Sequence, residues 1–149
     1  MRTLLLAVAI ATASIATPAF ADQAPVHTAL LSRLAVGGYD PVAYFTDGRA
    51  VRGSAEHRVT HQGYEYRFAS AEHLAAFRAN PARYLPQYGG YCAWAVSQGY
   101  TAAGNPNNWR IVDGRLYLNY NDEIQSRWER DIPGFIRSAN ANWPGVLSR

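Results

Sequence analysis

The chain of 149 residues contains no lysine and a single cysteine, Cys92. A lone cysteine has no partner in its own chain. This excludes an intrachain disulfide and leaves the hydrophobic core to hold the fold together. Without lysine, all of the basic side chains are arginines, and the formal net charge is only +3. Because the arginines are spread along the chain, the sequence argues against nucleic-acid binding.

Several enzyme signatures are also missing. The sequence has no CxxC redox pair, no CxxCH haem attachment site, no HExxH zinc motif, no GxSxG nucleophile turn and no phosphate-binding glycine loop. These absences favour a protein that is not an enzyme. A cysteine–histidine nucleophile stays open as an alternative, although no residue pattern points to an acyl substrate.

Only one long hydrophobic run is present, and it lies at the N-terminus. Arg2 precedes the apolar residues 4–15, and Ala19-Phe20-Ala21 fits the small-x-small pattern of a cleavage site. The run is shorter than the roughly 20 residues that span a bilayer. We predict that residues 1–21 are a signal peptide cleaved after Ala21 and that 22–149 form one domain. The protein would then be periplasmic, with no membrane span after cleavage.

The remaining chain predicts a small α+β domain, in which two antiparallel β-hairpins are interleaved with short helices. The hairpins are expected around the turns Gln62-Gly63 and Asp113-Gly114, with 104–108 as a loop before the second. Helices are expected at 28–34, 41–44, after the caps Ser70 and Asn121, at 91–97, and from Pro133 onward. We find no internal repeat in the sequence.

Three segments of the chain form a recognisable set: Asp40-Pro41-Val42, the strand Gly63-Tyr64-Glu65-Tyr66-Arg67-Phe68, and Asn80-Pro81-Ala82-Arg83-Tyr84. Together they resemble the YHS domain, a member of the TRASH-like, metal-associated group. With Tyr39 to Phe45 and Pro86 to Trp94, the chain is similar to exported single-domain bacterial YHS proteins over roughly residues 35–145. The resemblance implies a metal-associated fold, but it assigns no activity.

The positions of the metal ligands depart from that family. Metal-binding members of the wider group carry cysteines where this chain has Ala43, Ala69 and His73. Two positions have therefore lost any ligand, and only His73 keeps a nitrogen that could bind a metal. A closed structural zinc site, which needs four soft or borderline ligands, is not expected.

Cys92 is the main candidate for chemistry. It follows a glycine pair in Tyr88-Gly89-Gly90-Tyr91, and Trp94 lies just beyond it, so these residues are candidates to line a pocket around the thiol. A helix that begins near Tyr91 would favour the thiolate form, which binds soft metals. The alternative is a buried cysteine that packs as a small apolar residue.

The histidines do not form a chelating pair in the sequence. His57 and His61 lie four residues apart on a strand, which separates them by about 13 Å. His73 is the better candidate because it occupies a ligand position of the wider group. His27 lies in an N-terminal segment that we expect to fray.

Three functions remain open. The first is a periplasmic binding protein that handles a soft transition metal, with copper as the candidate cofactor, Cys92 and His73 as metal ligands, and a partner protein completing the site. The second is a structural or interaction module that kept the fold and lost the metal. The third is a thiol-based redox sensor or enzyme.

Overall fold

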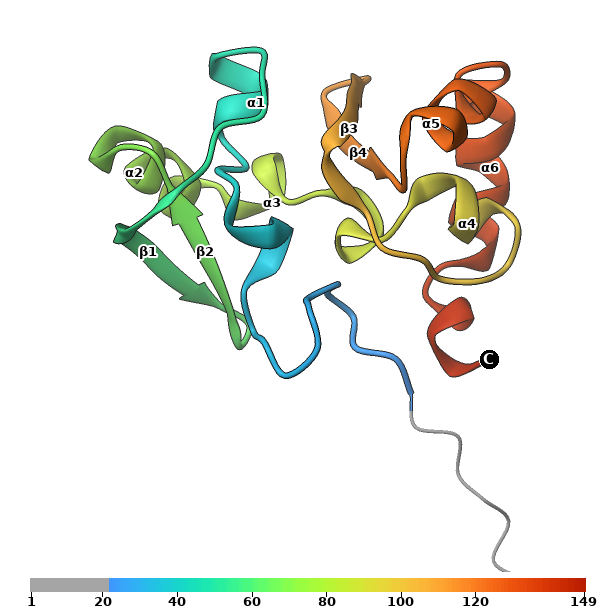
Figure 1. The fold of residues 1–149 in the computed structure, drawn as a ribbon, viewed down its shortest axis with the longest axis horizontal. Helices are drawn as coiled ribbons and strands as arrows, with labels where there is room; N and C mark the ends of the chain where they lie inside the picture. Colours follow the sequence, from blue (N-terminus) through green and yellow to red (C-terminus); the bar gives the residue numbers. More distant parts are fainter. Residues whose placement is uncertain (1–21) are drawn as a thin grey trace, which may run out of the picture.

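The computed structural model describes residues 22–149, so the predicted signal peptide lies outside the described residues. The expected α+β class is confirmed: two separate two-stranded antiparallel sheets alternate with short helices (Figure 1). The elements, with 3₁₀ turns labelled η, are η1 (Ala35–Gly38), α1 (Ala43–Thr46), β1 (Ser54–His61), β2 (Tyr64–Phe68), α2 (Ala71–Ala79), α3 (Pro81–Tyr84), η2 (Gln87–Gly90), α4 (Ala93–Ser97), β3 (Asn105–Val112), β4 (Arg115–Asn119), α5 (Asp122–Trp128), α6 (Ile132–Asn142) and η3 (Gly145–Ser148).

The two hairpins and two helix caps form as predicted. The Ser70 side chain accepts a hydrogen bond from the backbone N–H of His73 at the start of α2, and Asn121 accepts one from Ile124 at the start of α5. These bonds satisfy donors that a helix N-terminus leaves free. No helix within residues 22–149 is long and apolar enough to cross a membrane.

Three local predictions are wrong. Residues 28–34 form no helix, because Leu30 and Leu31 are 92% and 100% exposed and so have no surface to pack against. The predicted loop 104–108 belongs mostly to β3, where the pairing with β4 shifts register between Asn105 and Trp109. The helix predicted over 91–97 is shorter, because Cys92 has a non-helical backbone and α4 begins at Ala93.

The structure contains an internal repeat that we did not find in the sequence. β1 and β3 are both eight residues long, and β2 and β4 are both five. Each hairpin position corresponds to one 51 residues later (54 with 105, 64 with 115), and both hairpins have a register shift at the same place. We call 35–84 the N-terminal unit and 87–142 the C-terminal unit.

The turns that precede the hairpins repeat the same backbone conformation. Val36, Gly37 and Gly38 have φ angles of 53°, 58° and 82°, and Tyr88, Gly89 and Gly90 have φ angles of 56°, 60° and 84°. All six lie in the left-handed region, which is costly for residues other than glycine. The tight turn thus explains why a pair of glycines occurs at both positions.

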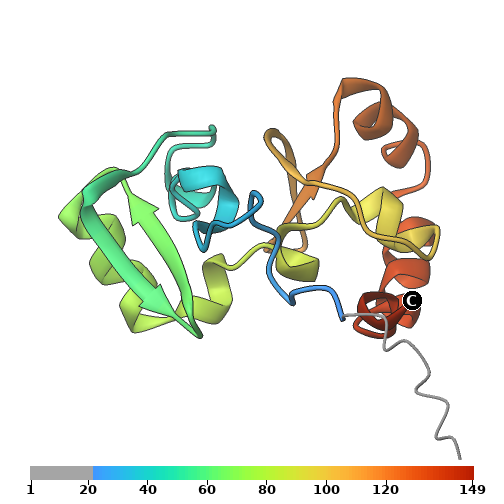
Figure 2. The ribbon, with the colours of Figure 1, turned by 60° about the horizontal axis from the view of Figure 1, so that its bottom comes forward.

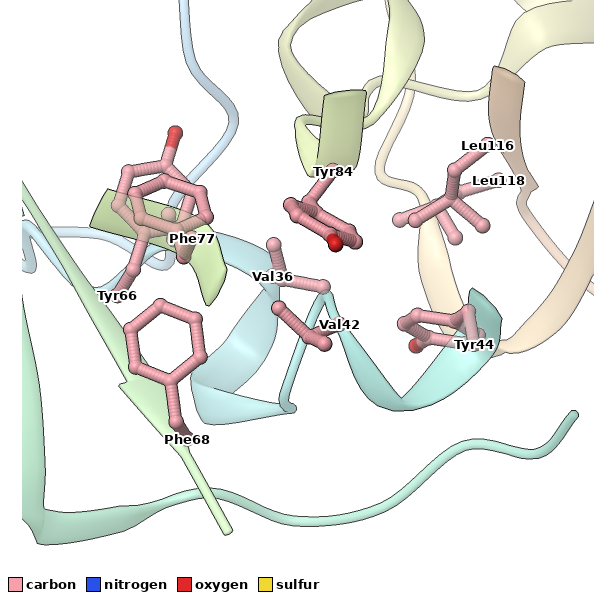
Figure 3. Packing of buried hydrophobic residues seen from close by; sticks show 10 residues of the cluster. Val36, Val42, Tyr44, Tyr66, Phe68, Phe77, Tyr84, Leu116 and Leu118 are labelled. Atoms are coloured by element: carbon pink, nitrogen blue, oxygen red, sulfur yellow. The ribbon is translucent and has the colours of Figure 1, made fainter. Parts of the chain in front are cut away.

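The two units pack through the second hairpin. Leu116 and Leu118 of β4 belong to the core of the N-terminal unit, together with Tyr44, Phe68 and other buried residues (Figure 3). Tyr117, between them on the strand, belongs instead to the core formed with α4 and α6. Because neighbouring strand residues face opposite sides, β4 separates the two cores and contributes to both.

Candidate functional site

Cys92 is completely buried at the residue that precedes α4. Its thiol donates to Asn119 Oδ1 at 3.5 Å. The same Asn119 oxygen accepts the backbone N–H of Trp94 at 3.0 Å, and the Asn119 amide donates to Gln125 Oε1 at 2.8 Å. Asn119 is itself fully buried, so it connects β4, α4 and α5 around the sulfur.

The surroundings of Cys92 favour the neutral thiol. Burial raises the pKa of the thiol, and the backbone N–H groups of Ala95, Tyr120 and Trp94 lower it by a smaller amount. The net pKa is above its ordinary value. The helix that was expected to activate the thiol is only five residues long. The geometry therefore gives a packed thiol in place of a reactive thiolate.

His73 lies in α2 and is bound at both ring nitrogens. Nδ1 donates to Asp40 Oδ2 at 2.6 Å, and Nε2 lies 3.1 Å from Thr46 Oγ1 and 3.8 Å from Asp47 Oδ1. The Asp40 carboxylate is fully buried. It also accepts backbone N–H groups from Val42 (2.8 Å), Ala43 (3.2 Å) and Ala69 (2.8 Å), so it holds the turn that leads into α1 and ties it to the end of β2.

Asp40 and Cys92 occupy corresponding positions of the repeat. The backbone N–H of Asp40 donates to Val51 at 2.8 Å, and that of Cys92 donates to Ala102 at 2.9 Å. Three backbone N–H groups surround the Asp40 carboxylate in the N-terminal unit, and three surround the Cys92 thiol in the C-terminal unit. His73 is the third residue after Ser70, the cap of α2, and Ile124 is the third residue after Asn121, the cap of α5. Ile124 therefore takes the position in the C-terminal unit that His73 has over Asp40.

The structure does not bring the two predicted metal ligands together. α2, which carries His73, and α4, which follows Cys92, lie at opposite sides of the molecule in both Figure 1 and Figure 2. Another histidine, His61, packs against the rings of Tyr66 and Phe77 in the N-terminal unit. The sequence alone did not indicate whether Cys92 and His73 are close in space.

A resident metal does not fit the described residues. Ala43 and Ala69 offer no ligand atoms, the ring of His73 is engaged on both sides, and Cys92 lies in the other unit. Across residues 22–149, no group of three or more histidine, cysteine, aspartate or glutamate side chains is arranged to hold a metal ion. A tightly held ion normally needs more ligands than either position supplies.

The expected pocket residues around the Gly-Gly turn are mostly covered. The hydroxyl of Tyr91 donates to the carbonyl of Ala24 at 2.8 Å, and the backbone N–H of His27 donates to Gly89 at 2.9 Å. The N-terminal segment thus packs on this turn and does not fray there. Tyr88 and Gly90 are buried, so among the candidates only Trp94 lines a pocket beside Cys92.

That pocket has a volume of about 290 Å³ and lies over the buried sulfur. Its aromatic lining residues are Trp94, Tyr100 and Tyr120, and the two tyrosines are 48% and 52% exposed. Sequence reasoning missed both tyrosines, because they come from loops at either end of the second hairpin. The recurrence of Gly-Gly-Tyr at 37–39 and 89–91 was the signal that could have identified the repeat and hence this position.

Comparison with known proteins gives one match. Residues 42–88 match the family model of the YHS domain, which confirms the resemblance stated from the sequence. The match spans the N-terminal unit from α1 to the start of η2 and ends before Cys92. The YHS domain is a metal-associated family. No curated protein and no solved structure gave a match.

Proposed function

We propose that this protein, whose chain carries a YHS domain over residues 42–88, is an exported, non-catalytic binding module that works without a resident metal. In this proposal the buried Asp40 carboxylate and the His73 ring stabilise the part of the fold where metal-binding members of the wider group hold their ion. Export rests on the predicted signal peptide at residues 1–21.

One observation carries the proposal. The only residue that keeps a ligand atom at a metal position of the wider group is His73, and both of its ring nitrogens already have partners, at 2.6 Å and 3.1 Å. A metal ion would have to displace Asp40 or Thr46 to reach the ring. Displacing Asp40 would leave a buried carboxylate with one donor fewer, which is costly.

Copper handling through Cys92 is the competing function. Copper(I) prefers thiolate ligands, and the sulfur borders a pocket, which supports this alternative. Against it, the thiol is fully buried, its pKa is raised by burial, and the neighbouring side chain is the amide of Asn119. A thiol redox sensor needs an exposed, acidic thiol and is disfavoured for the same reasons.

A competition titration distinguishes these functions. The reduced protein is titrated with copper(I) in the presence of a chromophoric chelator, alongside the Cys92→Ala and His73→Ala variants. We expect the chelator to keep the copper and the two variants to behave as the wild type does. The reason is that the Cys92 thiol is buried and the His73 ring already has a partner at each nitrogen.

Stoichiometric copper(I) binding by the wild type that disappears in Cys92→Ala would contradict the metal-free proposal and establish copper handling. Circular dichroism of each variant verifies that the fold is intact. N-terminal sequencing of the exported protein tests cleavage after Ala21.

A further inference from the structure

The pocket over Cys92 has a chemical character that neither the YHS match nor the metal-free proposal uses. It lies in the C-terminal unit, outside residues 42–88. Its lining residues are Cys92, Trp94, Ala95, Tyr100, Ala102, Tyr120, Asn121, Glu123 and Ile124. Its volume, about 290 Å³, is at the lower end of the range for small-molecule sites, which suits a compact ligand.

Aromatic rings form much of the wall. Trp94 and Tyr100 lie with ring centroids 6.4 Å apart and planes at 86°, so they form two roughly perpendicular sides. Tyr120 contributes a third ring to the lining. Four large hydrophobic residues among residues 22–149 are exposed, and two of them, Tyr100 and Tyr120, lie at this pocket. Several aromatic rings around one small space are the arrangement that recognises an organic cation.

The charges of the lining agree with a cationic ligand. Glu123 is the only charged residue in it, and no arginine or histidine belongs to it. A ring face carries partial negative charge, so the aromatic walls and Glu123 attract a cation and disfavour an anion. Glu123 also pairs with Arg127 at 2.6 Å on the surface of α5, which reduces its attraction for a ligand.

The hydrogen-bonding groups of the lining select among cations. The Cys92 thiol is paired with Asn119, the Asn121 oxygen accepts the N–H of Ile124, and the Glu123 carboxylate accepts from Arg127. A primary ammonium group would bring three N–H donors, whereas these three side chains already have partners and the hydroxyls of Tyr100 and Tyr120 lie at the edges of their rings, away from a cation held over the ring faces. A fully methylated ammonium has no N–H group and needs none of these acceptors.

The repeat allows the residues around Cys92 to be compared with those around Asp40. In the N-terminal unit the His73 ring lies over Asp40, and in the C-terminal unit Ile124 replaces that histidine. The residues that correspond to Val42 and Ala69 are the larger aromatic residues Trp94 and Tyr120. The C-terminal unit therefore has no ring at the centre of this position and has aromatic residues in the surrounding wall.

We propose that the pocket over Cys92 binds a quaternary ammonium group, held between the rings of Trp94, Tyr100 and Tyr120. The group can belong to a free small molecule such as choline or to a lipid headgroup. Both present the same trimethylammonium chemistry, and the experiment separates them.

The test uses choline chloride and its uncharged isostere, 3,3-dimethylbutan-1-ol, at constant ionic strength and with a metal chelator present. Binding is followed by tryptophan fluorescence and by saturation transfer to the ligand methyl protons. We expect a choline dissociation constant on the order of 0.1–1 mM and binding of the isostere about tenfold weaker.

Matched variants assign the binding to the rings. Tyr100 is half exposed, so we expect Tyr100→Leu to fold and to weaken choline binding on the order of fivefold, while Tyr100→Phe keeps the ring and stays within about twofold of wild type. Glu123→Gln weakens binding, and Arg127→Gln, which frees Glu123, strengthens it.

Vesicles distinguish the two sources of the ligand. Binding of choline without binding to phosphatidylcholine vesicles assigns a free small molecule, and vesicle binding that choline competes away assigns the headgroup. The proposal is overturned if wild type binds no choline at 20 mM, if the isostere binds equally well, or if folded Tyr100→Leu binds like wild type. Because the chelator removes copper, these outcomes are independent of the copper titration.

Discussion

The buried Asp40 carboxylate gives the sharpest test of how the N-terminal unit is held together. Replacing it by alanine removes the acceptor for three backbone N–H groups, those of Val42, Ala43 and Ala69, and for Nδ1 of His73. Each buried donor left without a partner costs about 1–3 kcal/mol, although water that enters the space recovers part of this. We expect Asp40→Ala to lower the free energy of unfolding by about 3–5 kcal/mol, because four donors around a buried carboxylate lose their acceptor together.

Two further variants provide a comparison for the loss of stability expected of Asp40→Ala. Asp40→Asn keeps one carbonyl oxygen for Val42 and Ala43 but places an amide N–H₂ opposite both donors to Oδ2, Ala69 and His73, so we expect a smaller loss of about 1–3 kcal/mol. Asp47→Asn removes a carboxylate that is 35% exposed and 3.8 Å from His73 Nε2, so we expect a loss below about 1 kcal/mol.

The assay is urea unfolding followed by tryptophan fluorescence, with the dependence on urea compared among the variants. Single domains are typically stable by about 5–15 kcal/mol, so the Asp40→Ala midpoint should fall far below that of wild type. A loss below 1 kcal/mol for Asp40→Ala, or equal losses for Asp40→Ala and Asp47→Asn, would refute the reasoning.

Three other results are expected. Because Cys92 is buried and its thiol pKa is raised, alkylation at pH 8 should be about 100-fold slower in the native protein than in urea, and equal rates would contradict the burial. Burial raises the pKa of Tyr66 to about 12 and also raises that of Tyr44, Tyr88, Tyr91 and Tyr117. The unfolded chain loses these protons first, so stability should be complete below about pH 10 and decrease from there towards pH 12; urea midpoints that stay constant up to pH 11 would argue against this. Gly89→Ala should lower stability by more than 2 kcal/mol, because the residue has a φ angle of 60° and its Cβ would collide with the carbonyl oxygen of Pro25, whereas Gly114→Ala, with φ of 73° and open space, should cost about 1 kcal/mol in the same urea assay.

Local chemistry made much of the fold predictable. The turns at Gln62-Gly63 and Asp113-Gly114 and the caps Ser70 and Asn121 depend on residues close in sequence, and all of them form. The helix predicted over 28–34 failed because its apolar residues need a surface from elsewhere in the fold. Such a surface is not encoded in the segment itself.

The site depended on contacts between distant residues. Asn119, which bonds to the Cys92 thiol, lies on a strand 27 residues away, and the aromatic wall joins Trp94, Tyr100 and Tyr120 from three separate segments. Neither spacing nor composition places such residues together. The repeat was hidden because the two units share turn geometry and strand lengths more than side chains.

The sequence by itself determined the fold class, the hairpins, the helix caps and the resemblance to the YHS domain, because each rests on short-range patterns of residues. Only the tertiary structure decided that Cys92 is buried beside Asn119, that His73 binds Asp40, and that Cys92 and His73 lie in different units. Burial and partner choice depend on how distant segments pack, and a linear pattern does not specify that packing.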